Sequence, residues 1–143
     1  MDDSLYRDEI LDHYFSSPHR GHIESPDSYA ELDNPVCGDR IRFELRLQPN
    51  GRIGQVRFDG HGCAISQAAA SMLAEFLEGR SLDEARQFSA GDMIRLLGIS
   101  LTPARLKCGL LGWHVLQRAV AASDGTELSD PTDRSDQGGP LPS

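Results

Sequence analysis

The chain has 143 residues, a usual length for a single domain. Acidic residues outnumber basic residues by 22 to 14, so the formal net charge is −8. Nucleic acids and anionic membranes bind basic surfaces, and neither is therefore expected as a partner. The sequence has no apolar stretch near the roughly 20 residues of a membrane span, and its acidic start differs from a secretory signal, so we expect a cytoplasmic protein.

The first half of the chain predicts one helix followed by a small antiparallel sheet. Apolar residues recur at helical spacing over 4–15. Alternation of apolar and charged residues predicts a half-buried strand over 40–47, and an Asn-Gly turn leads to its partner strand over 53–59. Because an isolated hairpin is only marginally stable in water, a third strand is expected, and 29–33 is the nearest candidate.

The second half predicts helices. The apolar face of 65–78 indicates one helix, and two short helices follow the capping residues Ser81 and Ser89, each with an acidic side chain three positions later. Pro103, at the first helical position, opens the last helix, which continues to about Ala122. The order of elements predicts an α+β fold, with about three antiparallel strands and helices packed on one face.

The composition changes after the last predicted helix. Residues 123–143 contain five acidic residues, one basic residue and almost no large apolar side chain. Such a segment cannot bury enough apolar surface to order itself. We therefore expect one domain over 1–122 and a disordered acidic tail over 123–143.

Three cysteines, Cys37, Cys63 and Cys108, carry the candidate chemistry. An odd number in a cytosolic protein argues against a disulfide framework. Their separations of 26 and 45 positions (63 − 37 and 108 − 63) match no zinc-finger spacing. The number and spacing of the cysteines are compatible with buried structural thiols and with one shared metal site. The local context of each cysteine favours the shared site.

Each cysteine is predicted to lie where a secondary-structure element begins or ends. Cys37 sits in a turn-forming segment two residues before Asp39, so a soft thiolate and a hard carboxylate can point at one metal ion. Cys63 follows Gly-His-Gly at a strand–helix junction, where the helix dipole favours the thiolate. Cys108 lies early in the last helix beside two cationic residues, which favour the thiolate as well.

The opening helix and three cysteine motifs resemble the iron–sulfur scaffold family of IscU, SufU and the NifU amino-terminal domain. The motifs read Asn-Pro-Val-Cys-Gly-Asp-Arg-Ile at 34–41, Gly-His-Gly-Cys-Ala-Ile-Ser at 60–66 and Pro-Ala-Arg-Leu-Lys-Cys at 103–108. The helix carries Leu-Tyr-Arg-Asp-Glu-Ile-Leu-Asp-His-Tyr at 5–14. Together they cover 4–122 in the order that the family has, and this joint match is specific where a single motif would not be.

The resemblance implies a small antiparallel sheet covered by helices, with the cysteines at one tip. The implied ligands of Zn²⁺ or of a transient [2Fe–2S] cluster are Cys37, Asp39, Cys63 and Cys108. The implied partner is a pyridoxal-phosphate cysteine desulfurase of the SufS or IscS type, with recipient apo-proteins or other assembly factors after it. In the zinc-dependent interpretation Cys108 accepts persulfide sulfur, and Arg105 and Lys107 keep its thiolate reactive.

Two features point to different branches of this family. Lys107 stands directly before the third cysteine, as in SufU-type proteins, where IscU-type proteins carry a histidine. The gap of 45 positions between Cys63 and Cys108 resembles the shorter IscU-type length. The first choice is a zinc-dependent sulfur acceptor of the sulfurtransferase kind. The alternatives are a non-enzymatic scaffold that assembles and releases a [2Fe–2S] cluster, and a structural zinc module that only binds partners.

Overall fold

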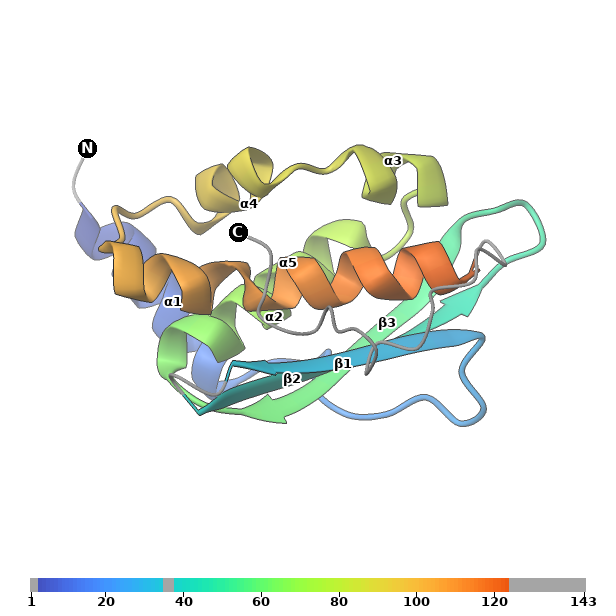
Figure 1. Ribbon diagram of the computed structural model, residues 1–143, viewed down its shortest axis with the longest axis horizontal. Coiled ribbons are helices and arrows are strands. Elements are labelled where there is room, and N and C mark those ends of the chain that lie inside the picture. Colours follow the sequence, from blue (N-terminus) through green and yellow to red (C-terminus); the bar gives the residue numbers. More distant parts are fainter. Residues whose placement is uncertain (1–2, 35–37, 124–143) are drawn as a thin grey trace.

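The computed structural model describes residues 3–34 and 38–123 (Figure 1). The elements, in chain order, are α1 (Asp3–Phe15), β1 (Ser28–Asn34), β2 (Asp39–Leu47), β3 (Ile53–His61), α2 (Ala64–Leu77), α3 (Leu82–Gln87), α4 (Ala90–Leu97) and α5 (Pro103–Ser123). The predicted α+β class is confirmed, and the expected third strand is β1. The predicted tail lies outside the described residues from Asp124 onward, and so does Cys37.

The three strands form an antiparallel sheet in the order β1-β2-β3. At its centre Phe43 of β2 pairs with Phe58 of β3. Ile41, Phe43 and Leu45 alternate along β2 and are fully buried against the helices, as the sequence pattern predicts. The sheet therefore has one apolar face, and the start of β2 lies at the same end of the sheet as the finish of β3.

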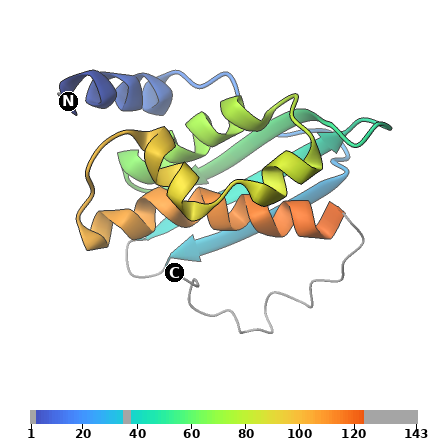
Figure 2. The same ribbon diagram turned by 90° about the horizontal axis from the view of Figure 1, so that it is seen from above.

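The helices lie on that apolar face (Figures 1 and 2). α2 and α5 pack side by side on the sheet, α1 flanks α2, and α3 and α4 lie across them as an outer layer. Gly112 of α5 faces Ala70 of α2, and an added Cβ there would lie in van der Waals contact, 3.4 Å from the Ala70 Cα. Within the described chain, none of the helices combines the length and apolar character that crossing a membrane requires. This packing places the first turns of α2 and α5 near each other.

The segment 19–27 binds to β3 and then to the opposite face of the sheet. Gly21 donates its N–H to a carbonyl of β3 at 2.8 Å. Farther along, the carboxylate of Glu44 accepts hydrogen bonds from the Ile23 N–H at 2.6 Å and from Arg42 Nε at 2.7 Å. Burial of Glu44 favours its neutral form, but these bonds outweigh burial and lower the pKa of its carboxyl. The segment is thus anchored to the sheet at more than one point.

Candidate metal centre

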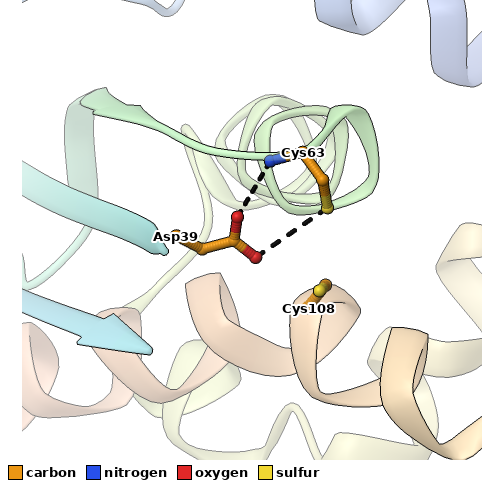
Figure 3. Close-up of side chains that lie close together, drawn as sticks. All are labelled: Asp39, Cys63 and Cys108. Carbon is orange, nitrogen blue, oxygen red and sulfur yellow. Dashed lines mark hydrogen bonds between the residues drawn. The ribbon is translucent and has the colours of Figure 1, made fainter. Parts of the chain in front are cut away.

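Three of the predicted site residues meet at one end of the molecule. Asp39 is the first residue of β2, Cys63 directly precedes α2, and Cys108 lies in the second turn of α5. One carboxylate oxygen and the two sulfur atoms all lie within 4.8 Å of one another (Figure 3). Residues that are 24 and 45 positions apart in sequence (63 − 39 and 108 − 63) therefore form one cluster.

Asp39 is the most constrained member of the cluster. Its side chain is fully buried, and its Oδ1 accepts a hydrogen bond from the backbone N–H of Cys63 at 2.8 Å. Its Oδ2 lies 3.8 Å from the Cys63 sulfur. Among the described residues no cationic side chain pairs with this carboxylate. A buried carboxylate with one backbone donor is costly unless a cation completes its surroundings.

Two glycines make the close approach of Asp39 to the strand–helix junction possible. An added Cβ at Gly62 would lie 2.0 Å from the Asp39 Oδ1, and one at Gly60 would lie 2.0 Å from the carbonyl oxygen of Arg40. Both glycines have positive φ, +139° and +156°, in the range that residues with side chains rarely adopt. Glycine at positions 60 and 62 is therefore a geometric requirement of the cluster.

Cys63 and Cys108 differ in exposure. Cys63 is half-buried and occupies the N-cap position of α2, where its side chain makes no capping hydrogen bond. Cys108 is buried, with 3% of its surface exposed, and its sulfur lies 3.9 Å from the Ala104 carbonyl oxygen. The Cys63 thiol is the more accessible of the two. Of the two sulfurs in the described part of the site, that of Cys63 is the one at the surface.

The remaining predicted site residues are Arg105, Lys107 and Cys37. Arg105 and Lys107 are exposed on α5, three positions and one position before the buried Cys108. Cys37 lies outside the described residues, and of its flanking residues the Gly38 N–H donates to the Asn34 carbonyl at 2.8 Å. Asn34 pairs with Asp39 in the sheet, so both described neighbours of this segment lie near Asp39.

Sequence reasoning missed a polar network beneath Cys63. Gln67 and Ser66 in the first turn of α2 are almost fully buried, with 2% and 0% of their surfaces exposed. Both bond to the Cys63 carbonyl oxygen, the Gln67 backbone N–H at 3.2 Å and the Ser66 hydroxyl at 3.1 Å. The available signal was the presence of these polar residues directly after Cys63, at the start of the predicted helix, because polar groups that become buried need fixed partners.

The donor set fits a metal ion. Two thiols and one carboxylate are the mixed soft and hard ligands that Zn²⁺ and iron accept. The buried carboxylate of Asp39, which lacks a cationic partner in the described part of the chain, supports the same conclusion independently of the thiols. Three protein ligands leave room for a fourth.

Comparison with known proteins gives the cluster its context. Residues 5–128 match the family described as the NifU-like N-terminal domain. The chain belongs to this family. The resemblance drawn from the cysteine motifs is thereby confirmed.

Several relatives cover nearly the whole domain. The zinc-dependent sulfurtransferase SufU of Bacillus subtilis is 34% identical over 140 residues, which cover 86% of this chain and 94% of the relative. The iron–sulfur cluster assembly scaffold protein IscU 1 of Archaeoglobus fulgidus is 31% identical over 116 residues, covering 81% and 74%.

Solved structures show the same fold. The crystal structure of FiSufU from Fervidobacterium islandicum AW-1 superposes with a TM-score of 0.71 at 28% identity, covering 84% of this chain and 99% of that chain. The N-terminal part of a NifU-like protein from Brucella abortus gives a TM-score of 0.69, covering 86% and 96%. At 20% identity this second likeness concerns the fold alone.

Replacing Asp39 by asparagine tests the need for a cation. The amide side chain of the Asp39→Asn variant keeps an acceptor for the Cys63 N–H but removes the buried charge. We expect Zn²⁺ affinity to fall by about tenfold or more, while metal-free stability is unchanged or rises by about 1 kcal/mol. Chelator competition and urea unfolding measure the two quantities. The control is Asp33→Asn, an exposed aspartate of β1, and wild-type Zn²⁺ affinity in Asp39→Asn would contradict the assignment.

The Gly62→Ala substitution tests the geometry of the junction. Its Cβ would collide with the Asp39 carboxylate, so we expect a loss of Zn²⁺ affinity of about tenfold or more together with lower stability. Gly51→Ala is the matched control, because Gly51 has φ +85° in the hairpin turn but no atom within 4 Å of an added Cβ. The control should lose stability and keep its Zn²⁺ affinity; an equal loss of affinity in both variants would refute a local effect.

Proposed function

We propose that this protein takes part in iron–sulfur cluster assembly and accepts sulfur at a metal site. The observation that carries the proposal is the cluster of one carboxylate oxygen and two sulfurs within 4.8 Å of one another, on a fold of the NifU-like N-terminal domain family. The proposed ligands are Cys37, Asp39, Cys63 and Cys108. Cys37 is included because it lies two positions before Asp39 in the motif that the family resemblance rests on.

Zn²⁺ is the proposed resident metal. The Bacillus subtilis relative is a zinc-dependent sulfurtransferase by name, and Lys107 occupies the position before the third cysteine here. Bound Zn²⁺ would hold the cysteine ligands in the deprotonated thiolate form. The buried Asp39 carboxylate supplies the fourth proposed donor, an oxygen beside the three sulfurs.

The proposed reaction moves one sulfur atom between proteins. The Cys108 thiolate attacks the outer sulfur of a cysteine persulfide on a pyridoxal-phosphate cysteine desulfurase. A new sulfur–sulfur bond forms on Cys108, the old one breaks, and its electron pair leaves with the desulfurase thiolate. Cys108 thereby becomes a persulfide and the desulfurase cysteine returns to its thiolate. Arg105 and Lys107, exposed beside it, would keep negative charge favourable at this surface.

A [2Fe–2S] scaffold is the second candidate. The Archaeoglobus fulgidus relative is a cluster assembly scaffold by name, and the same residues offer thiolates to iron. In this role the cluster is cargo, and Asp39 is the weaker ligand that makes its release easier. Recipient apo-proteins or other assembly factors would then take the cluster from the Cys63 side, where the site is more accessible.

Metal analysis distinguishes the two candidates. We expect the purified protein to hold about one Zn²⁺ per chain and to remain without visible absorbance after anaerobic addition of iron and sulfide. Elemental analysis and a visible spectrum provide the readouts. A stable cluster chromophore that displaces zinc would instead establish the scaffold role, and a protein that binds neither would overturn the assignment of the centre.

The Cys108→Ser substitution tests the sulfur acceptor. With a cysteine desulfurase and cysteine, the wild-type protein should raise desulfurase turnover and carry one added sulfur atom on Cys108. The variant should do neither, because its hydroxyl is a poor nucleophile at neutral pH. Peptide mass spectrometry locates the added sulfur, and circular dichroism confirms that the fold is retained.

Surface variants complete this test. Arg105→Ala and Lys107→Ala should slow transfer without abolishing it, whereas Arg95→Ala, an exposed arginine on α4, should leave the rate unchanged. A persulfide found on Cys63 alone, with Cys108→Ser fully active, would show that the acceptor has been assigned to the wrong thiol.

A further inference from the structure

We propose that Arg20 is a positioning residue for Cys63. Its guanidinium reaches the strand–helix junction from a different part of the chain and holds that junction through a line of hydrogen bonds. The inference rests on the proposed function only in taking Cys63 as a ligand of the metal centre. It assigns a role to a residue that no motif in the sequence singles out.

The backbone around Arg20 is fixed to the edge of β3. Arg20 forms a bridge with Phe58, whose N–H donates to the His19 carbonyl at 2.9 Å and whose carbonyl accepts the Gly21 N–H at 2.8 Å. The Arg20 guanidinium carbon lies 4.9 Å from the centre of the Phe58 ring. Stacking on an aromatic ring restricts a guanidinium without neutralising it. These contacts fix the base of the Arg20 side chain, and 35% of the surface of that side chain is exposed.

The two ends of the guanidinium bind both sides of the junction. Nη1 donates to the carbonyl oxygen of Gly60 at 3.5 Å and lies 3.8 Å from the Asp59 carboxylate, both at the end of β3. Nη2 donates to the Gln67 Oε1 at 3.3 Å, in the first turn of α2. One side chain thus spans the two elements that Gly60 and Gly62 connect. The planar fork of arginine suits this role, since a lysine has a single charged nitrogen.

The bond to Gln67 begins a line that ends on Cys63. Gln67 Nε2 donates to the Ser66 hydroxyl at 3.2 Å, and that hydroxyl donates to the Cys63 carbonyl oxygen at 3.1 Å. Every donor in the line points the same way, from Arg20 towards Cys63, and aligned hydrogen bonds strengthen one another. Gln67 is almost fully buried, so the loss of Arg20 would leave its carbonyl oxygen without the partner it has now.

This line of hydrogen bonds holds the carbonyl group of Cys63, the second polar group of its backbone. Asp39 holds the N–H of Cys63 from one side, and the line from Arg20 holds its carbonyl from the other. The junction needs both because Gly60 and Gly62 precede Cys63, and glycines restrict the backbone least. Partners behind the ligands that orient a metal-binding side chain commonly contribute one to two orders of magnitude to affinity. Arg20 acts at this level, through Gln67, and touches no metal ligand itself.

The test compares Arg20→Ala with Arg46→Ala. Arg46 anchors the same 19–27 segment through the carbonyls of Glu24 and Ser25 but has no link to Cys63. Arg20→Ala should lower Zn²⁺ affinity by about tenfold and alter the thiolate-to-metal absorption of the Co²⁺-loaded protein. Arg46→Ala should leave both unchanged. Urea unfolding of each variant separates a positioning effect from a general loss of stability.

A second variant tests the line itself. Gln67→Leu removes the middle of the line, so adding Arg20→Ala to it should cost less Zn²⁺ affinity than Arg20→Ala costs in the wild-type protein. Losses that add in full would place Arg20 outside this line and overturn the proposal. So would an Arg20→Ala protein with the Zn²⁺ affinity and Co²⁺ spectrum of the wild type.

The alkylation rate of Cys63 gives a readout that needs no metal. In the metal-free full-length protein, iodoacetamide should modify Cys63 several times faster in Arg20→Ala than in the wild type, since the half-buried thiol is freed when the junction loosens. Arg46→Ala should react at the wild-type rate. If the wild-type protein bound no metal, the proposed function would fail while this comparison still decided the role of Arg20; equal rates in all three proteins would reject it.

Discussion

The hydrogen bond from the Cys63 N–H to the buried Asp39 carboxylate joins the start of β2 to the start of α2, and the candidate centre depends on it. A carboxylate with no exposed surface must have compensating partners, and the described residues give it one backbone donor and two nearby thiols. The contact is possible only because Gly62 carries no Cβ. Asp39 thus has two effects: it orients the junction that carries Cys63, and it leaves negative charge where a cation is needed.

The rest of the fold positions the third member of the cluster. Cys108 reaches the other two residues because α5 packs beside α2 on the sheet, with Gly112 of α5 facing Ala70 of α2. Gly109, next to Cys108, faces Leu97 and Leu101, and an added Cβ would lie 2.9 Å and 3.1 Å from their side chains. The end of α4 and the connection after it therefore pack directly against the turn of α5 that carries the thiol. Apolar packing determines the distance between the two sulfurs, since no disulfide links Cys63 and Cys108.

Most of the described residues of the centre are buried, whereas the Cys63 thiol is partly exposed. Asp39 and Cys108 are buried, Ser66 and Gln67 fill the space beneath Cys63, and Cys63 itself is half-buried. Such an arrangement suits a site that must pass sulfur or a cluster to another protein, because the reacting atoms stay ordered while one side admits a partner. Structures at 20% and 28% identity share this fold, so packing of the sheet and helices tolerates extensive substitution.

Local patterns in the sequence determined the elements. Alternation predicted β2 and β3, the serine-led capping boxes predicted α3 and α4, and Pro103 marked the first residue of α5. These predictions succeed because each depends on neighbours within a few residues. The sequence also selected Cys63, Cys108 and Asp39 as candidates, with the family resemblance adding what spacing did not show.

Only the tertiary structure decided how those candidates relate in space. Positions 39, 63 and 108 are too far apart for any spacing rule, and their convergence follows from strand order and from helix packing over the whole domain. The burial of Asp39 also had no local signal, because it depends on what covers the first residue of β2. The same holds for Arg20, which looks like an ordinary surface arginine in the sequence. Its contacts with Gly60 and Gln67 arise only when the segment before β1 pairs with the edge of β3, since that pairing brings together residues 40 and 47 positions apart.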